Sequence, residues 1–439
     1  MKWKNLALAA SLLCGLVSHS QALTADQVKS FTLPNGMKFL VLESHTIPNA
    51  NMYTYWKVGS RNVVPGIAGL SHFFEHMMFN GSKKFGPKQF DRTMEAAGGA
   101  NNAYTNNDLT VYQDWFPATA LPVIFDLESD RIANLSIDPK MVESERGVVL
   151  SERSTGLENS NLRSLWGAVY ATAFHAHPYA IPTIGHESDI KAWTQTDLEN
   201  YFKTYYSPNN AVAVIVGAVK ADEVKRLAEQ YFAKAPQRAL PPVVRTVEPE
   251  QKGERRVFVR KESATTPNLM VSYKVPPTNN PDYYALQVLN SILTEGKTSR
   301  LYQALVDKRL ATQVGADYGK AFDPGLFNFF AVAANQVPAA KVEAALLAEI
   351  DKLIREGVSE EEVQKVKNQK LLNFYRAQET INGKAAQIGD YEVYFGDYKK
   401  LFDAPEAYRR LRAADIQRVA ATYFKKSQRT VGVLAASEE

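Results

Sequence analysis

Residues 71–79 hold three side chains whose types and spacing could do metal chemistry. His72 and His76 are four residues apart, and Glu75 lies between them. Residues four apart lie one above the other on a helix face, so on a helix both imidazoles would point at one place. Two imidazoles so placed are half of a zinc site, and a carboxylate beside them can take a proton from a water molecule at the metal. The segment therefore predicts a helix with His72 and His76 as zinc ligands and Glu75 as a base.

The alternative is that these are ordinary histidines on an amphipathic helix. The remaining residues of the segment are strongly apolar, which makes this alternative costly. Burying three titratable groups among such side chains costs free energy unless something uses them. The apolar neighbours are Phe73, Phe74, Met77, Met78 and Phe79.

A third zinc ligand is expected from a second helix, which should begin after Asp138 with Pro139 in its first turn. Glu145 and Glu152 are seven residues apart on this helix, so they share one face two turns apart. Surface helices are rich in glutamate, and both side chains could simply be solvated. A zinc site needs a third protein ligand, however, and two packed helices could supply it. We take Glu152 as the candidate ligand and Glu145 as a carboxylate that orients its neighbours from outside the ligand set.

The stretch Asn102, Ala103 and Tyr104 follows the histidine helix and precedes an expected strand over residues 109–115. It could be an irregular polar loop. It could also be an edge strand, and an exposed edge can pair with an extended peptide through backbone hydrogen bonds.

Length and composition indicate a globular protein of two domains. The chain has 439 residues, of which 45% are hydrophobic and 22% charged. Lys and Arg total 51 against 47 Asp and Glu, a net charge of +4, and there is no long run of one sign. Nothing in this balance indicates a nucleic-acid partner.

Residues 1–22 have the features of a secretory signal peptide. Lys2 and Lys4 precede a short apolar run, and small residues end the segment. The run is too short to span a bilayer, although an uncleaved membrane anchor stays possible. We expect an exported protein, periplasmic if the source is a Gram-negative bacterium. Cys14 is the only cysteine and lies in this segment, so the mature chain would hold no disulfide.

The pattern of the second half of the chain indicates a repeat of the first after a Pro-rich linker over residues 236–253. Residues 197–216 match residues 415–434 at a constant offset of 218, residues 137–142 match 358–363 at 221, and Gly81 matches Gly296 at 215. A chance likeness of two helix–strand units is the alternative. The repeat predicts an N-terminal zinc domain over 23–235 and a C-terminal domain of the same fold over 254–439.

The second copy lacks the metal-binding residues, so one zinc ion per chain is expected, in the first half. Carried across by these offsets, the three residues of the zinc motif fall on Gln287, Asn290 and Ser291. Glu145 and Glu152 fall on Val366 and Asn373.

The chain resembles the pitrilysin family, which includes insulin-degrading enzyme and the mitochondrial processing peptidase. The resemblance rests on the His-x-x-Glu-His order typical of inverzincins, the Glu145–Glu152 pair, and the stretches 102–105 and 177–179. It implies an α+β fold of two homologous domains, each a mainly antiparallel sheet packed with helices. It also implies a zinc peptidase of the half-size type that assembles from two chains, with the substrate backbone paired to residues 102–104. The implied zinc ligands are His72, His76 and Glu152, and the implied base is Glu75.

One feature of the family is missing. Its members usually supply an Arg and a Tyr from a C-terminal domain to hold the substrate carbonyl, and here Leu305 or Val306 and Thr312 stand at those places. We therefore expect a homologous partner chain to supply them in a heterodimer, with a homodimer as the alternative. A non-catalytic assembly subunit and a peptide-binding module of the same fold are the competing functions.

Overall fold

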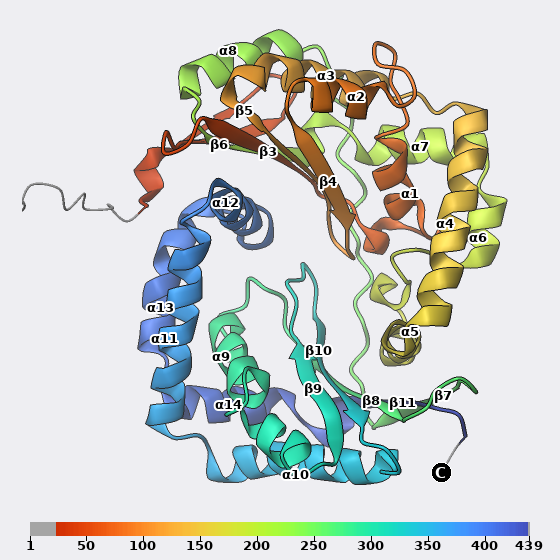
Figure 1. The fold of residues 1–439 in the computed structure, drawn as a ribbon, viewed down its shortest axis with the longest axis vertical. Coiled ribbons are helices and arrows are strands. Elements are labelled where there is room, and N and C mark those ends of the chain that lie inside the picture. Colours follow the sequence, from red (N-terminus) through yellow and green to blue (C-terminus); the bar gives the residue numbers. More distant parts are fainter. Residues whose placement is uncertain (1–22, 438–439) are drawn as a thin grey trace, which may run out of the picture.

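The computed structural model describes residues 23–437, so the signal peptide expected over 1–22 lies outside the described residues. Figure 1 shows two lobes, each built on one sheet, that face each other across the molecule. None of the helices in this described part is long and apolar enough to cross a membrane.

The first sheet has the strand order β1-β2-β6-β3-β5-β4. Its first two strands form a hairpin at Asn35-Gly36, where Gly36 has a φ of +86° that suits glycine. All neighbouring pairs are antiparallel except β2 and β6. The strands are β1 (Val28–Thr32), β2 (Lys38–Glu43), β3 (Asn49–Trp56), β4 (Ala100–Thr105), β5 (Thr110–Pro117) and β6 (Ala211–Gly217).

The second sheet repeats this topology without a counterpart of β1. Its order is β7-β11-β8-β10-β9, and only β7 and β11 are parallel. The strands are β7 (Arg255–Arg260), β8 (Asn268–Val275), β9 (Ala311–Asp317), β10 (Gly325–Ala333) and β11 (Arg429–Ala435). The expected α+β class, with two homologous and mainly antiparallel sheets, is confirmed.

The helices follow the same repeat. The helix before β11 begins and ends 218 residues after the helix before β6. The strands β6 and β11 have the same offset. The larger helices of the first half are α1 (Leu70–Met77), α2 (Gln89–Ala96), α3 (Leu121–Asn134), α4 (Pro139–Asn159), α5 (Asn161–Ala173), α6 (Glu187–Ala192), α7 (Gln195–Tyr205) and α8 (Ala221–Tyr231). Those of the second half are α9 (Tyr283–Thr294), α10 (Ala339–Glu356), α11 (Glu360–Ala377), α12 (Ile381–Phe395), α13 (Ala404–Arg410) and α14 (Ala413–Tyr423).

Each half lends one helix to the other half's sheet. Helix α5 packs on β7, β8 and β11, whereas α12 packs on β3 and β6. Gly432 lies so close to α5 that a Cβ there would overlap Val169, and Gly389 on α12 is equally close to the ring of Tyr55. No helix or strand lies between α8 and β7, where the linker is expected. The halves are consecutive in sequence but interlocked in packing.

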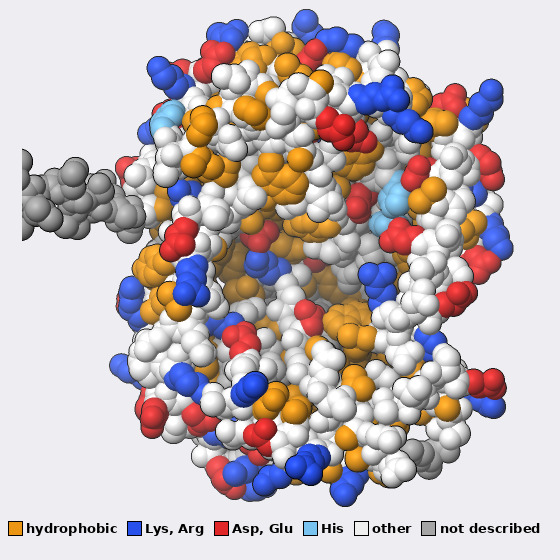
Figure 2. Space-filling model, viewed as in Figure 1, with side chains coloured by type: hydrophobic (Ala, Val, Ile, Leu, Met, Phe, Trp, Pro, Cys, Tyr) orange, Lys and Arg blue, Asp and Glu red, His pale blue; other side chains and the backbone are white. Residues whose placement is uncertain are grey.

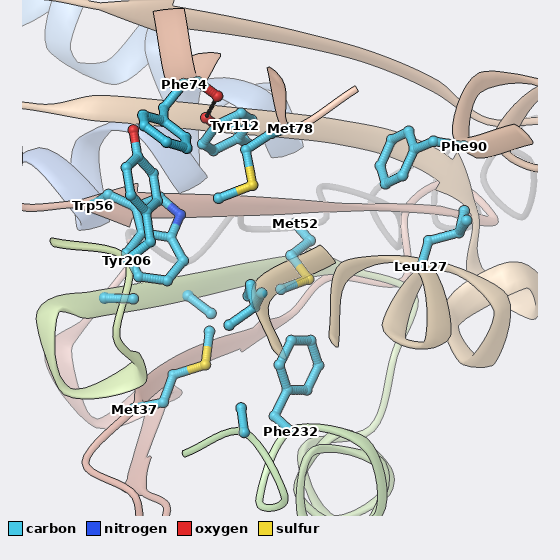
Figure 3. Close-up of a cluster of buried hydrophobic side chains, with 14 of the residues drawn as sticks. Met37, Met52, Trp56, Phe74, Met78, Phe90, Tyr112, Leu127, Tyr206 and Phe232 are labelled. Atoms are coloured by element: carbon cyan, nitrogen blue, oxygen red, sulfur yellow. Dashed lines mark hydrogen bonds between the residues drawn. The ribbon is translucent and has the colours of Figure 1, made fainter. Parts of the chain in front are cut away.

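The largest core cluster fills the space between the first sheet and its helices. Figure 3 shows aromatic and methionine side chains from distant segments meeting there, among them Trp56, Phe74 and Tyr206. The hydroxyl of Tyr112 on β5 donates a hydrogen bond to the backbone carbonyl of Phe74 on α1, at 3.0 Å (Figure 3). This contact fixes the histidine helix against the sheet.

Candidate metal centre

Helix α1 buries one face and presents the other to the space beside α4. Its N-cap is Gly69, whose φ of +95° places the turn before the helix. Phe73, Phe74 and Met77 are fully buried in the core. His72 and His76 lie on another face at four-residue spacing and are only partly buried, as the apolar spacing of the segment dictates.

Three donor atoms meet between α1 and α4. His72 Nε2 and His76 Nε2 are 3.3 Å apart. Glu152 Oε2 on α4 lies 3.5 Å from His72 Nε2 and 3.6 Å from His76 Nε2. Ligands about 2.0–2.2 Å from a tetrahedral zinc ion stand about 3.3–3.5 Å from one another, which the three observed separations match. The donor set therefore fits zinc without rearrangement.

The carboxylate of Glu145 lies behind His76. Its Oε1 is 2.8 Å from His76 Nδ1, and its Oε2 accepts a hydrogen bond of 2.9 Å from Asn80 Nδ2. Holding Nδ1 in this way leaves Nε2 of His76 free to face Glu152. Glu145 thus orients the ring from outside the donor triangle, and Asn80 in turn fixes Glu145.

The two histidines differ in their protonation behaviour. Burial, together with the charge of His76, lowers the pKa of His72 to about 4, so this imidazole is neutral at neutral pH. Burial alone would lower the pKa of His76 too, but the hydrogen bond to Glu145 and the nearby carboxylate charges raise it. That hydrogen bond is the main reason that the pKa of Glu145 is lowered.

Glu75 lies on α1 between His72 and His76, near Thr105 at the end of β4. Burial raises the pKa of Glu75, while a hydrogen bond with the side chain of Thr105 opposes this shift. Thr105 is the last residue of β4, and its hydroxyl is also 3.4 Å from that of Thr110. A carboxylate with a raised pKa beside the two histidines has the properties of a general base that must also return a proton.

Strand β4 is the outermost strand of the first sheet on this side. It pairs with β5 through residues 100–105, and its other edge meets no strand in the described part of the chain. Asn102 and Tyr104 are exposed, and Ala103 between them is half-buried. The three residues expected to bind substrate therefore lie on a free strand edge next to the donor group.

The equivalent place in the second half has no metal-binding group. Gln287 and Ser291 on α9 bond within their own half, to the carbonyls of Tyr318 and Gln287. Val366 on α11 is buried core. Residues 23–437 contain one group of at least three His, Cys, Asp or Glu side chains whose ligand atoms lie within 4.8 Å of one another. This group is His72, His76 and Glu152.

A cavity of about 750 Å³ opens beside the donor group, between the two halves. Its wall includes His72, Glu152 and residues 104–108 from the first half and residues 317–321 from the second. Figure 2 shows the hollow between the lobes, with a pale blue histidine surface at its rim near α1 and α4. The end of β4 runs into this hollow, so an extended chain along β4 would enter it.

Comparisons with known proteins identify the family of this chain. Residues 38–187 match the insulinase (peptidase family M16) model, and residues 192–370 match the M16 inactive domain model. The zinc protease PqqE of Helicobacter pylori is 31% identical over 434 residues, which cover 97% of each chain. This chain belongs to the M16 peptidase family.

Other M16 proteins align over most of the chain. A probable β subunit of the mitochondrial-processing peptidase of Arabidopsis thaliana is 26% identical over 93% of this chain and 78% of its own. The crystal structure of a protease from Helicobacter pylori superposes with a TM-score of 0.90 at 30% identity, over 93% of this chain and 99% of that one. The periplasmic protease PqqL of Escherichia coli shares the fold at 18% identity and a TM-score of 0.78, and this chain spans 48% of its length.

Two residues of this centre carry no signal in the sequence. Asn80 lies four residues after His76, the spacing that places it on the same helix side, but a single asparagine after a helix is usually a cap. Thr105 ends the expected substrate strand, and only the register of β4 against β5 brings it to Glu75.

Proposed function

We propose that this chain is a zinc endopeptidase that cleaves extended peptides. The observation that carries the proposal is the triangle of His72 Nε2, His76 Nε2 and Glu152 Oε2, with separations of 3.3–3.6 Å and Glu75 beside it. The M16 relatives named as zinc proteases support it. One zinc ion per chain is proposed, held in the first half.

Glu75 is the proposed general base. Bound zinc would acidify a water molecule and polarise the scissile carbonyl. The carboxylate of Glu75 accepts the proton of that water and passes it to the leaving amine. Its raised pKa favours the first transfer, since the carboxylate of a weaker acid is a stronger base. Thr105 is the proposed positioning residue for this carboxylate.

Strand β4 is the proposed binding site for the substrate backbone. Backbone pairing along Asn102, Ala103 and Tyr104 would hold a peptide extended beside the donor group. Such pairing reads the main chain, so selectivity for side chains should be loose. A segment within a folded protein is not free to extend along β4 into the cavity between the halves, so we propose short or unfolded peptides as substrates.

A partner chain is proposed to complete the centre. Leu305 and Val306 lie in the short π-helix Tyr302–Val306, and Leu305 is fully buried. Thr312 lies on β9 without a phenol. Neither place can supply the Arg and Tyr that would hold the carbonyl oxygen, so these groups would come from a homologous chain. We also propose export, periplasmic in a Gram-negative source, on the basis of residues 1–22.

The test is hydrolysis of a pool of short unstructured peptides by the purified mature chain, with and without a chelator. Cleavage that stops with the chelator and returns with zinc supports a peptidase that needs no partner. Cleavage that appears only when a co-purified homologous chain is added supports the two-chain form. Retention of intact peptides under both conditions, with zinc bound, would instead favour a peptide-binding module and overturn the proposal.

A further inference from the structure

The ligand Glu152 lies on a part of α4 with few buried contacts in its own half, although Arg153 Nε donates a hydrogen bond of 3.2 Å to Gly185 O there. The buried residues of α4 are Val142 and Val149, and none of residues 150–159 is buried. The side chain of Glu152 is 44% exposed. A helix end with few buried contacts opens easily. The last turn of α4, beyond Arg153, needs a further support if Glu152 is to keep its place 3.5 Å from His72.

A lysine of the second half supports this last turn. Lys261 directly follows β7, and its Nζ donates hydrogen bonds to the carbonyls of Leu157, at 3.0 Å, and Glu158, at 2.8 Å. The last carbonyls of a helix lack partners within the helix and carry partial negative charge, which a cation stabilises. The backbone of Lys261 is itself bonded to Ala435 O at 2.9 Å, so the lysine is fixed to the second sheet.

Helix α5 continues the attachment. The hydroxyl of Ser164 donates to Leu157 O at 2.9 Å, which joins the start of α5 to the end of α4. Leu165 and Val169 of α5 are fully buried in a cluster with Met270 and Leu434 of the second sheet. The end of α4 is therefore bound to the second half by a charge-assisted cap and by a packed helix.

We propose that the second half, which lacks the metal-binding residues, positions the third zinc ligand. Lys261 is the positioning residue, and it acts through α4 on Glu152. This inference rests on the proposed function, because it concerns the same donor group. The second half would then both line the cavity and hold Glu152 in place. Movement between the halves would shift Glu152 relative to His72 and His76, which are fixed to the first core.

The experiment measures the zinc dissociation constant of the full mature chain by competition with a chromophoric chelator, well below the unfolding temperature. Lys261→Met keeps the apolar stem and removes the cap. We expect about tenfold weaker zinc binding, the usual scale for partners that hold a ligand in place. Lys261→Arg should restore most of the affinity. Arg260→Met is the matched control, since Arg260 is exposed and pairs with Glu262 alone in the described chain, and its affinity should equal that of the wild type.

A second pair of variants tests the packed helix. Val169→Ala loosens α5 on the second sheet, and Val393→Ala makes the same truncation on α12, which covers the first sheet. We expect weaker zinc binding for Val169→Ala alone, together with a changed visible spectrum of the cobalt-substituted protein.

The outcomes separate the two proposals. A wild-type chain that binds no zinc would overturn the proposed function and this inference with it. A wild-type chain that binds zinc, with Lys261→Met binding it equally well, would overturn the positioning role alone. A lower unfolding temperature for Lys261→Met with unchanged zinc affinity has the same meaning, since the lysine would then only stabilise the fold.

Discussion

His76 Nδ1 lies 2.8 Å from Glu145 Oε1, while Nε2 of the same ring faces His72 and Glu152. One nitrogen is thus held by a carboxylate and the other is free for a metal. This arrangement fixes both the tautomer and the orientation of the ring, which a histidine on an exposed helix face would not otherwise keep.

Glu145→Gln should weaken zinc binding about tenfold, because the amide keeps the shape of the side chain but loses the charge that holds His76. The variant should fold normally, since Glu145 is only partly buried. A chelator competition titration measures the affinity. An unchanged dissociation constant would show that the hydrogen bond to His76 does not support the donor group.

Glu75→Gln should keep zinc and lose turnover by about 10²–10⁴-fold, since the amide cannot accept a proton. Zinc content by elemental analysis and peptide hydrolysis are measured on the same sample. Glu95→Gln on the exposed side of α2 is the control and should behave as wild type. Normal turnover in Glu75→Gln would assign the base to another group.

Backbone methylation of the substrate tests pairing with β4. Replacing one amide N–H near the scissile bond by N-methyl removes a main-chain hydrogen bond and should raise KM by about tenfold, whereas most side-chain changes should have smaller effects. A panel of matched peptides with single N-methyl groups gives the comparison. Equal KM values across the methylated series would contradict strand pairing.

Asp108 should make the stability depend on pH. Burial raises its pKa to about 6, although the hydrogen bond from Tyr179 and the charge of Arg61 oppose the shift. Below pH 3.8 the carboxyl is protonated in both folded and unfolded chains. Because the folded chain holds this proton more tightly, the free energy of unfolding is highest below pH 3.8. It falls by up to about 3 kcal/mol as the pH rises through about 6, at 1.36 kcal/mol per pKa unit.

Asp108→Asn mimics the protonated carboxyl, so it should remove that part of the pH dependence. Unfolding temperatures of the variant and the wild type, measured at pH 4 and pH 7.5, should diverge in favour of the variant at the higher pH. A difference that stays the same at both pH values would show that Asp108 titrates at its ordinary pKa.

The repeat and the spacing of motifs predicted much of the fold because they are local or periodic. The offset of 218 between residues 197–216 and 415–434 is kept by α7 and β6 against α14 and β11. The four-residue spacing of the histidines placed both on one face of α1. The capping role of Asp138 follows the same local logic, since its side chain accepts from the amides of Lys140 and Met141.

The rest depends on contacts that no local pattern encodes. The apolar residues of α5 indicate that one of its faces is buried, but they do not show that this face packs on the sheet of the other half. Lys261 meets Leu157 across 104 residues of chain, and a single lysine after a strand is usually solvated. Glu152 had the right spacing from Glu145, but only the packing of α4 against α1 brings its carboxylate to the histidines.

The most direct measurement of the central claim is anomalous diffraction at the zinc edge from a crystal of the zinc-loaded mature chain. The account predicts one peak per chain, about 2.0–2.2 Å from His72 Nε2, His76 Nε2 and a carboxylate oxygen of Glu152. A peak elsewhere, a second peak in the C-terminal half, or no peak from zinc-loaded protein would contradict it.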